Sequence, residues 1–167
     1  LAADAALAKN KDHWFVNEVI GQMRRTLKRL DLMSKTSFAF VEGKQSCFVG
    51  SLFEMALAAD RTYMLDDPDE QTFVQLSPMN NGHLPMGNLL SRLQTRFYGD
   101  PGHADELAVK SVRYQAADAE GEGLVTFIPD DIDWDDEVRM AIEERASLSP
   151  DALTGMESNL RWPGPET

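Results

Sequence analysis

Apolar residues recur at helical spacing soon after the start of the chain. Between Trp14 and Leu32 they are three or four residues apart, at Phe15, Val19, Met23, Leu27 and Leu30. Residues this far apart share one face of a 3.6-residue helix, so this stripe is expected to face a core. The Ala-rich segment 1–10 before it predicts a shorter, frayed helix.

Short apolar runs that end at turn residues predict strands elsewhere. They lie at 37–41, 61–65, 72–76 and 124–128. Helices are expected between and after these strands, at 52–59, 86–98, from 101, 116–122, 133–146 and from 149 onward. Because helices and strands alternate along the chain, the pattern favours the α/β class.

Composition narrows the range of partners. The 167 residues are 43% hydrophobic and 26% charged, with a formal net charge of −12, which is typical of a folded domain and argues against nucleic acid as a partner. No apolar run approaches the roughly 20 residues of a membrane span, so no membrane partner is expected. The single cysteine, Cys47, favours a reducing compartment, the cytoplasm. The first residue is Leu1 and the end has loop-like composition, so we expect a piece of a longer polypeptide.

Metal and nucleotide motifs are not found in the sequence. His13, His83 and His103 are far apart, and Cys47 has no CxxC partner. No GxxxxGK[ST], GxGxxG or GxSxG pattern occurs. We therefore expect no metal and no cofactor.

The segment that offers the most candidates for catalytic groups begins where the strand predicted at 37–41 ends in a glycine turn. Gly50 and Ser51 open a helix that carries Glu54 in its first turn. The first N–H groups of a helix are unpaired and partly positive, and a glycine lets a ligand oxygen approach the backbone. Gly50 and Ser51 are therefore candidates for an oxyanion hole, with Glu54 as a candidate general acid/base. The alternative is a capped helix whose glutamate complements the helix dipole.

Two motifs indicate a family. The segment 54–60, Glu-Met-Ala-Leu-Ala-Ala-Asp, resembles the core motif of the crotonase (enoyl-CoA hydratase/isomerase) superfamily, in which the Glu and Asp are also six residues apart. The segment 116–125 is similar to that superfamily's helix followed by Gly-Leu-Val. The resemblance implies a partial crotonase-like spiral of strand–strand–helix turns over 1–128, followed by a C-terminal helical region over 129–167.

A closer resemblance links segments 46–65, 129–139, 152–160 and 164–167 to a ring-cleaving lyase branch of the superfamily. It implies a parent enzyme of aerobic benzoate breakdown that converts 2,3-dihydro-2,3-dihydroxybenzoyl-CoA to a semialdehyde acyl-CoA and formate. No cofactor is implied, because the substrate is carried as a CoA thioester. The implied partners are this acyl-CoA, the rest of the same polypeptide and a second copy in a homodimer. This chain resembles the C-terminal half, which is the implied scaffold.

A hydratase-type site needs a second carboxylate about twenty residues after the first. Glu54 is followed at that distance by Val74, Gln75, Ser77 and Met79, none of which is acidic. Bulky Leu52 and Phe53 also stand where a thioester would lie. Three hypotheses follow: a scaffold within a lyase, a self-sufficient hydratase or isomerase that uses Glu54, and a non-catalytic packing or dimerisation module.

Overall fold

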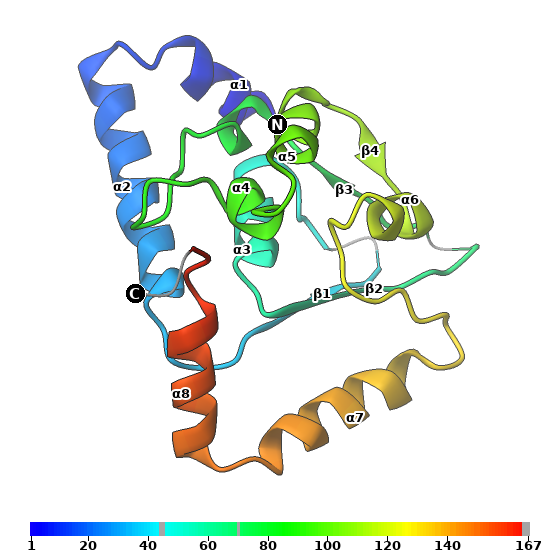
Figure 1. Ribbon diagram of the computed structural model, residues 1–167. Helices are drawn as coiled ribbons and strands as arrows, with labels where there is room; N and C mark the ends of the chain where they lie inside the picture. The colour runs from blue at the N-terminus through cyan, green and yellow to red at the C-terminus, as the bar shows by residue number, and fades with distance from the viewer. Residues whose placement is uncertain (44–45, 70, 165–167) are drawn as a thin grey trace.

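The computed structural model describes residues 1–43, 46–69 and 71–164. The first two helices are α1 (Ala2–Lys9), which lies at the top of the molecule in Figure 1, and α2 (Trp14–Asp31), which forms its left-hand side. Two more, α7 (Trp134–Ala146) and α8 (Pro150–Leu160), form the lower edge in the same view. The mixture of helices and strands between them confirms the predicted α/β class.

The central pair of strands is parallel. β1 (Phe38–Val41) pairs with β2 (Arg61–Met64), with Phe38 opposite Arg61 and Val41 opposite Met64. The connection between them contains the 3₁₀ turn η1 (Gly50–Leu52) and α3 (Phe53–Leu57), as parallel pairing requires a crossover. A separate antiparallel pair joins β3 (Val74–Gln75) to β4 (Arg113–Tyr114).

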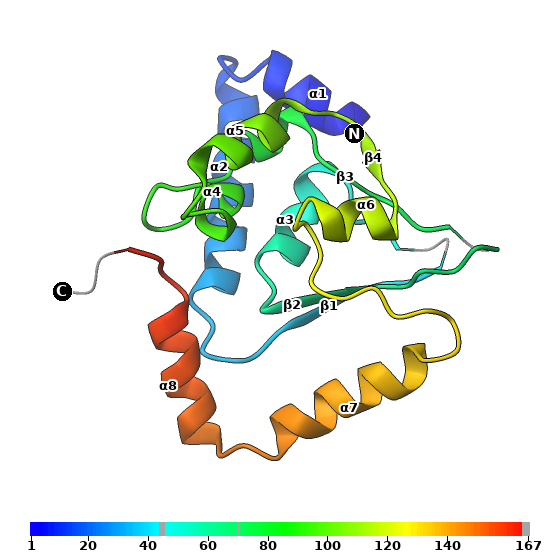
Figure 2. The same ribbon diagram turned by 45° about the vertical axis from the view of Figure 1, so that its right-hand side comes forward.

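Helices cover both faces of the β1–β2 pair, as Figure 2 shows. On one face, Phe53 and Ala56 of α3 pack with Val41 and Met64 in the main core. On the other face, Trp134 and Ala141 of α7 pack against Tyr63. Alternate residues of β1 and β2 thus face different apolar layers, as the period of a strand dictates.

A second core lies between α2 and the loop that follows β3. Ile20 and Leu27 of α2 pack with Met79 and Leu84. Met79 belongs to the 3₁₀ turn η2 (Pro78–Asn80), whose start is capped by the Ser77 side chain. This loop therefore holds α2 against the main core.

Two predicted elements are wrong. The helix expected at 86–98 is reduced to α4 (Arg92–Arg96), because Leu89 has φ 71° and Ser91 caps the helix start. The strand expected at 124–128 makes only one bridge, between Phe127 and Tyr63. The strand β4 was not predicted.

The remaining helices agree with the expected positions. They are α5 (Pro101–Val109), α6 (Ala116–Gly121), α7 and α8. The expected helix at 52–59 begins as η1 and continues as α3. The prediction therefore identified most helices and missed the short pairings that depend on distant partners.

Candidate functional site

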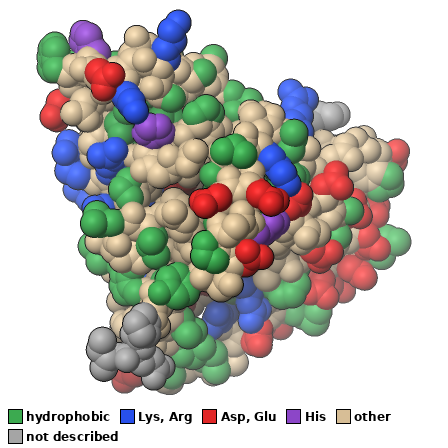
Figure 3. Space-filling model, turned by 45° about the horizontal axis from the view of Figure 1, so that its top comes forward, with side chains coloured by type: hydrophobic (Ala, Val, Ile, Leu, Met, Phe, Trp, Pro, Cys, Tyr) green, Lys and Arg blue, Asp and Glu red, His purple; other side chains and the backbone are tan. Residues whose placement is uncertain are grey.

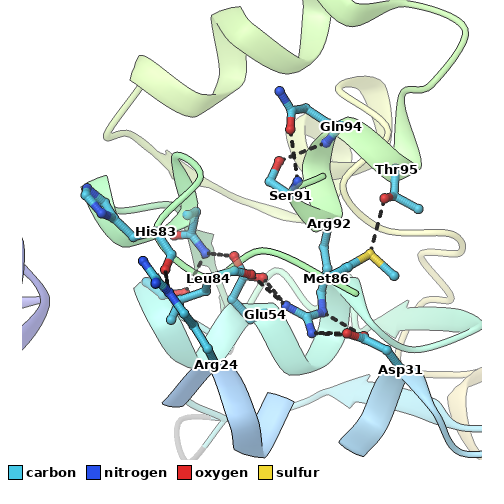
Figure 4. Close-up of polar contacts among 12 residues, drawn as sticks. Arg24, Asp31, Glu54, His83, Leu84, Met86, Ser91, Arg92, Gln94 and Thr95 are labelled. Atoms are coloured by element: carbon cyan, nitrogen blue, oxygen red, sulfur yellow. Dashed lines mark hydrogen bonds and ion pairs between the residues drawn. The ribbon is translucent and has the colours of Figure 1, made fainter. Parts of the chain in front are cut away.

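Glu54 lies in the core, with 1% of its surface exposed. One carboxylate oxygen accepts a hydrogen bond from Asn80 Nδ2 at 2.7 Å, and the other accepts one from Arg92 Nη1 at 2.8 Å (Figure 4). Burial raises the pKa of Glu54, while Arg92 and Asn80 act in the opposite direction. Both oxygens are therefore engaged in internal contacts.

Arg92 connects Glu54 to a second buried carboxylate. Its Nη2 donates to both oxygens of Asp31, at 2.9 and 2.7 Å, and its Nη1 also donates to the carbonyl of Leu84 at 3.2 Å. Asp31 ends α2, Glu54 lies in α3 and Arg92 begins α4. This buried cluster of Asp31, Glu54, Asn80 and Arg92, hereafter the Arg92 cluster, fixes three helices to one another.

Sequence reasoning missed three members of this cluster: Asp31, Asn80 and Arg92. The only available signal was Arg92 beside Leu93, inside an apolar segment, where a charge requires a partner. Its partners are 61 and 38 residues away in the chain. Their identity could not be inferred without the fold.

Gly50 and Ser51, the oxyanion-hole candidates, face a carboxylate of the protein itself. The backbone N–H of Ser51 donates to Asp4 Oδ2 at 2.6 Å, and the Ser51 hydroxyl donates to Asp4 Oδ1 at 2.7 Å. The Ser77 hydroxyl also donates to Asp4 Oδ2, at 2.6 Å. Asp4 is buried, so an internal anion satisfies the Ser51 N–H that was expected to meet a substrate oxygen.

The glycine at position 50 is required by this contact. Its φ is +57°, in the left-handed region, and a Cβ built there would lie 2.1 Å from Asp4 Oδ2. Asn80 Nδ2 also donates to the carbonyl of Gly50 at 3.0 Å. The sequence feature that suggested a ligand site thus accommodates Asp4 from α1.

The positions at the expected spacing after Glu54 do not supply a second acid, and the nearby carboxylate of Asp31 is paired with Arg92. Met79, at the expected distance along the chain, is fully buried in the α2 core. Phe53 is fully buried in the main core, whereas Leu52 is 45% exposed. Asp60, the other acid of the family motif, accepts a hydrogen bond from the backbone N–H of Ser37 at 2.6 Å. It therefore anchors the start of β1.

No cluster of three or more potential metal ligands occurs within the described parts of the chain. In the same parts, no helix has the length and apolar character needed to cross a membrane. Cys47 is exposed.

The architecture defines a class of protein. An enoyl-CoA hydratase/isomerase family protein from Hyphomonas neptunium superposes with a TM-score of 0.69 at 18% identity, covering 90% of this chain and 54% of that one. An enoyl-CoA hydratase/isomerase from Marinobacter aquaeolei gives a TM-score of 0.65 at 19% identity, covering 94% and 58%. The chain therefore has a partial crotonase fold, as the sequence motifs indicated.

The likeness in sequence to one relative is more specific than the likeness in fold. The chain is 53% identical over 170 residues to benzoyl-CoA-dihydrodiol lyase from Aromatoleum evansii. This match covers all of this chain and 30% of the relative's length, and no family model matches. The expected resemblance to a lyase that acts on a benzoyl-CoA derivative is confirmed at the level of this relative's name.

Proposed function

We propose that the full-length protein containing this chain is a lyase that opens the ring of 2,3-dihydro-2,3-dihydroxybenzoyl-CoA. The addition of water and carbon–carbon cleavage would give formate and a semialdehyde acyl-CoA. The observation that carries this proposal is the 53% identity to benzoyl-CoA-dihydrodiol lyase across the whole chain. An identity of this size across the whole chain supports a common fold for the two proteins.

An acyl-CoA thioester as substrate also agrees with the fold. Among the structural neighbours, a hydratase homologue from Thermobifida fusca was solved with acetoacetyl-CoA, and methylmalonyl-CoA decarboxylase with 2S-carboxypropyl-CoA. In the proposal, the substrate contacts and the proton-transferring groups lie mainly outside this chain. Homodimerisation and a cytoplasmic location are part of the same proposal.

Within the full-length protein, we propose that this portion acts as a scaffold. Both oxygens of Glu54 are held by Arg92 and Asn80, so neither is free to exchange a proton with a substrate. The Ser51 N–H is held by Asp4, so it is not free to stabilise an enolate. The alternative, a hydratase or isomerase that uses Glu54, requires both groups to be free.

The test is an assay of formate release by the full-length protein from the dihydrodiol thioester, with crotonyl-CoA hydration as the competing activity. We expect formate release in the full-length protein, and neither activity in the 167-residue chain alone. Hydration of crotonyl-CoA by the 167 residues would overturn the scaffold assignment. Absence of formate release from a folded full-length protein would overturn the lyase proposal.

A further inference from the structure

A cavity of about 290 Å³ lies apart from Asp4 and Ser51, where α3 ends and α4 faces α8. Its apolar lining includes Leu57, Met86, Met156 and Leu160. Four arginines, from the two helices α4 and α7 and from the segment after α8, also line it: Arg92, Arg96, Arg145 and Arg161. The three lining carboxylates are Asp31, Asp60 and Glu157.

The balance of positive and negative side chains around the cavity differs from that of the molecule as a whole. The chain carries a net charge of −12. Asp and Glu side chains gather on the right-hand edge of the surface in Figure 3, whereas Lys and Arg side chains are spread over several places, among them the left-hand edge and the lower middle. The cavity lining has four arginines against three carboxylates. A small anion is repelled by most of this surface, so a cavity that contains arginines without a carboxylate partner is a place where one can bind.

Two of the four arginines are committed to carboxylates. Arg92 forms its ion pairs with Asp31 and Glu54. Arg161 Nη2 lies 3.0 Å from Glu157 Oε2 and 3.7 Å from Asp60 Oδ1. The contacts of Arg161 hold the segment after α8 against the cavity wall. The two arginines that remain are Arg96 and Arg145.

Arg96 and Arg145 form no ion pair with any carboxylate in the described part of the chain. Arg96 donates through Nε to the carbonyl of Gly123, and burial lowers its pKa. Arg145 has a buried Nε without a hydrogen-bond partner among the described residues. A buried donor left unpaired is unfavourable, so a ligand that accepts a hydrogen bond from it gains binding energy.

We propose that this cavity binds a small organic carboxylate with an apolar body. A guanidinium presents parallel N–H groups that match the two oxygens of a carboxylate, and Arg145 and Arg96 supply such groups. The apolar body would lie against Met86, Met156 and Leu160. The volume of about 290 Å³ is at the lower end for ligand pockets, which suits a molecule the size of benzoate.

The inference does not rest on the proposed lyase activity, because the cavity is formed entirely within this chain. Its test is titration calorimetry of the full-length gene product with benzoate and with benzamide, a neutral molecule of the same shape. We expect benzoate to bind at least tenfold more tightly than benzamide. Equal affinities, or binding of inorganic phosphate without binding of benzoate, would overturn the assignment.

The residues are tested with Arg145→Met, which removes the unpaired donor and breaks no side-chain hydrogen bond within the described parts of the chain. Arg139→Met is the matched control, because Arg139 lies on the same helix but pairs on the exposed surface with Asp136 and Glu143. Arg145→Met is expected to weaken benzoate binding at least tenfold, and Arg139→Met less than twofold. An equal effect of the two variants, with unchanged melting temperatures, would refute the site.

Discussion

The carboxylate of Asp4 accepts a hydrogen bond at 2.6 Å from the backbone N–H of Ser51, 47 residues further along the chain. It also accepts hydrogen bonds from the hydroxyls of Ser51 and Ser77. A helix-start N–H is often the place where an enzyme holds a substrate anion, and here the protein's own anion occupies it. The contact connects α1 to the start of the crossover between β1 and β2, so its main effect should be on stability.

Asp4→Ala should destabilise the protein by about 2–4 kcal/mol, because two hydroxyls and one N–H lose a charged acceptor while buried. Asp4→Asn keeps one acceptor oxygen and should cost less. Chemical denaturation measures the free energy of unfolding of both variants. Asp12→Asn, at an exposed position after α1, controls for the loss of one negative charge, and a cost for Asp4→Ala no larger than for this control would contradict the buried contact.

Gly50→Ala should be at least as damaging, at about 2 kcal/mol or more. An alanine at φ +57° is strained, and its Cβ would collide with Asp4 Oδ2. Gly121→Ala, where an added Cβ meets nothing within 4 Å, should be neutral or slightly stabilising. In the double variant with Asp4→Ala the collision disappears and the backbone strain remains, so the two costs should be less than additive.

The sequence revealed the helices more readily than the contacts between them. In α2 the predicted stripe began at Phe15, yet Phe15 is 57% exposed, and the buried apolar positions are Ile20 and Leu27. A periodic pattern defines a helix, but its exact rotation depends on the partner, here the η2 loop with Met79 and Leu84. The false extension of α4 has a different origin, because Ser91 and Gln94 form a capping box, a sequence signature of a helix start that the prediction over 86–98 did not use.

The helix start that carries the candidate residues was located correctly in the chain, but the environment of these residues was not accessible from the sequence. Local rules place Gly50, Ser51 and Glu54 at the start of a helix, and the structure has them there. Whether these groups face a ligand depends on Asp4 and Arg92, which are remote in sequence. No local spacing rule encodes such contacts.

Replacements in the Arg92 cluster should separate structural from catalytic roles. Glu54→Gln leaves Arg92 paired with Asp31 and should cost about 1–3 kcal/mol. Arg92→Met leaves two buried carboxylates without their cation and should cost about 3–5 kcal/mol. Denaturant titration of both variants measures their free energies of unfolding and shows which replacement costs more stability.

Turnover by the same Glu54→Gln variant, measured in the full-length protein, should stay within a few-fold of the wild-type rate. The reason is that both Glu54 oxygens are bound internally. A hundredfold loss of rate at an unchanged fold, the usual effect of losing a general acid/base, would instead place Glu54 in the active site.

The last prediction concerns Glu157, which receives hydrogen bonds from Thr36 at 2.8 Å and from Arg161 at 3.0 Å. Burial raises the pKa of Glu157 above 4.5, the neighbouring Asp60 adds to the rise, and the contacts with Thr36 and Arg161 oppose it. A carboxyl whose pKa is raised in the folded state contributes stability that is present below its unfolded pKa and lost as pH rises through the folded value. The stability of the wild type relative to Glu157→Gln should therefore fall as pH increases from about 4 toward neutrality.

Unfolding free energies of the two proteins at a series of pH values measure this difference, with Glu137→Gln on the exposed side of α7 as the control for net charge. Asp60→Asn should make the fall smaller, because removing that carboxylate removes one cause of the raised pKa. A difference that is constant or grows with pH would show that Arg161 and Thr36 outweigh burial at Glu157. The segment after α8 would then be held most firmly at neutral pH rather than in acid.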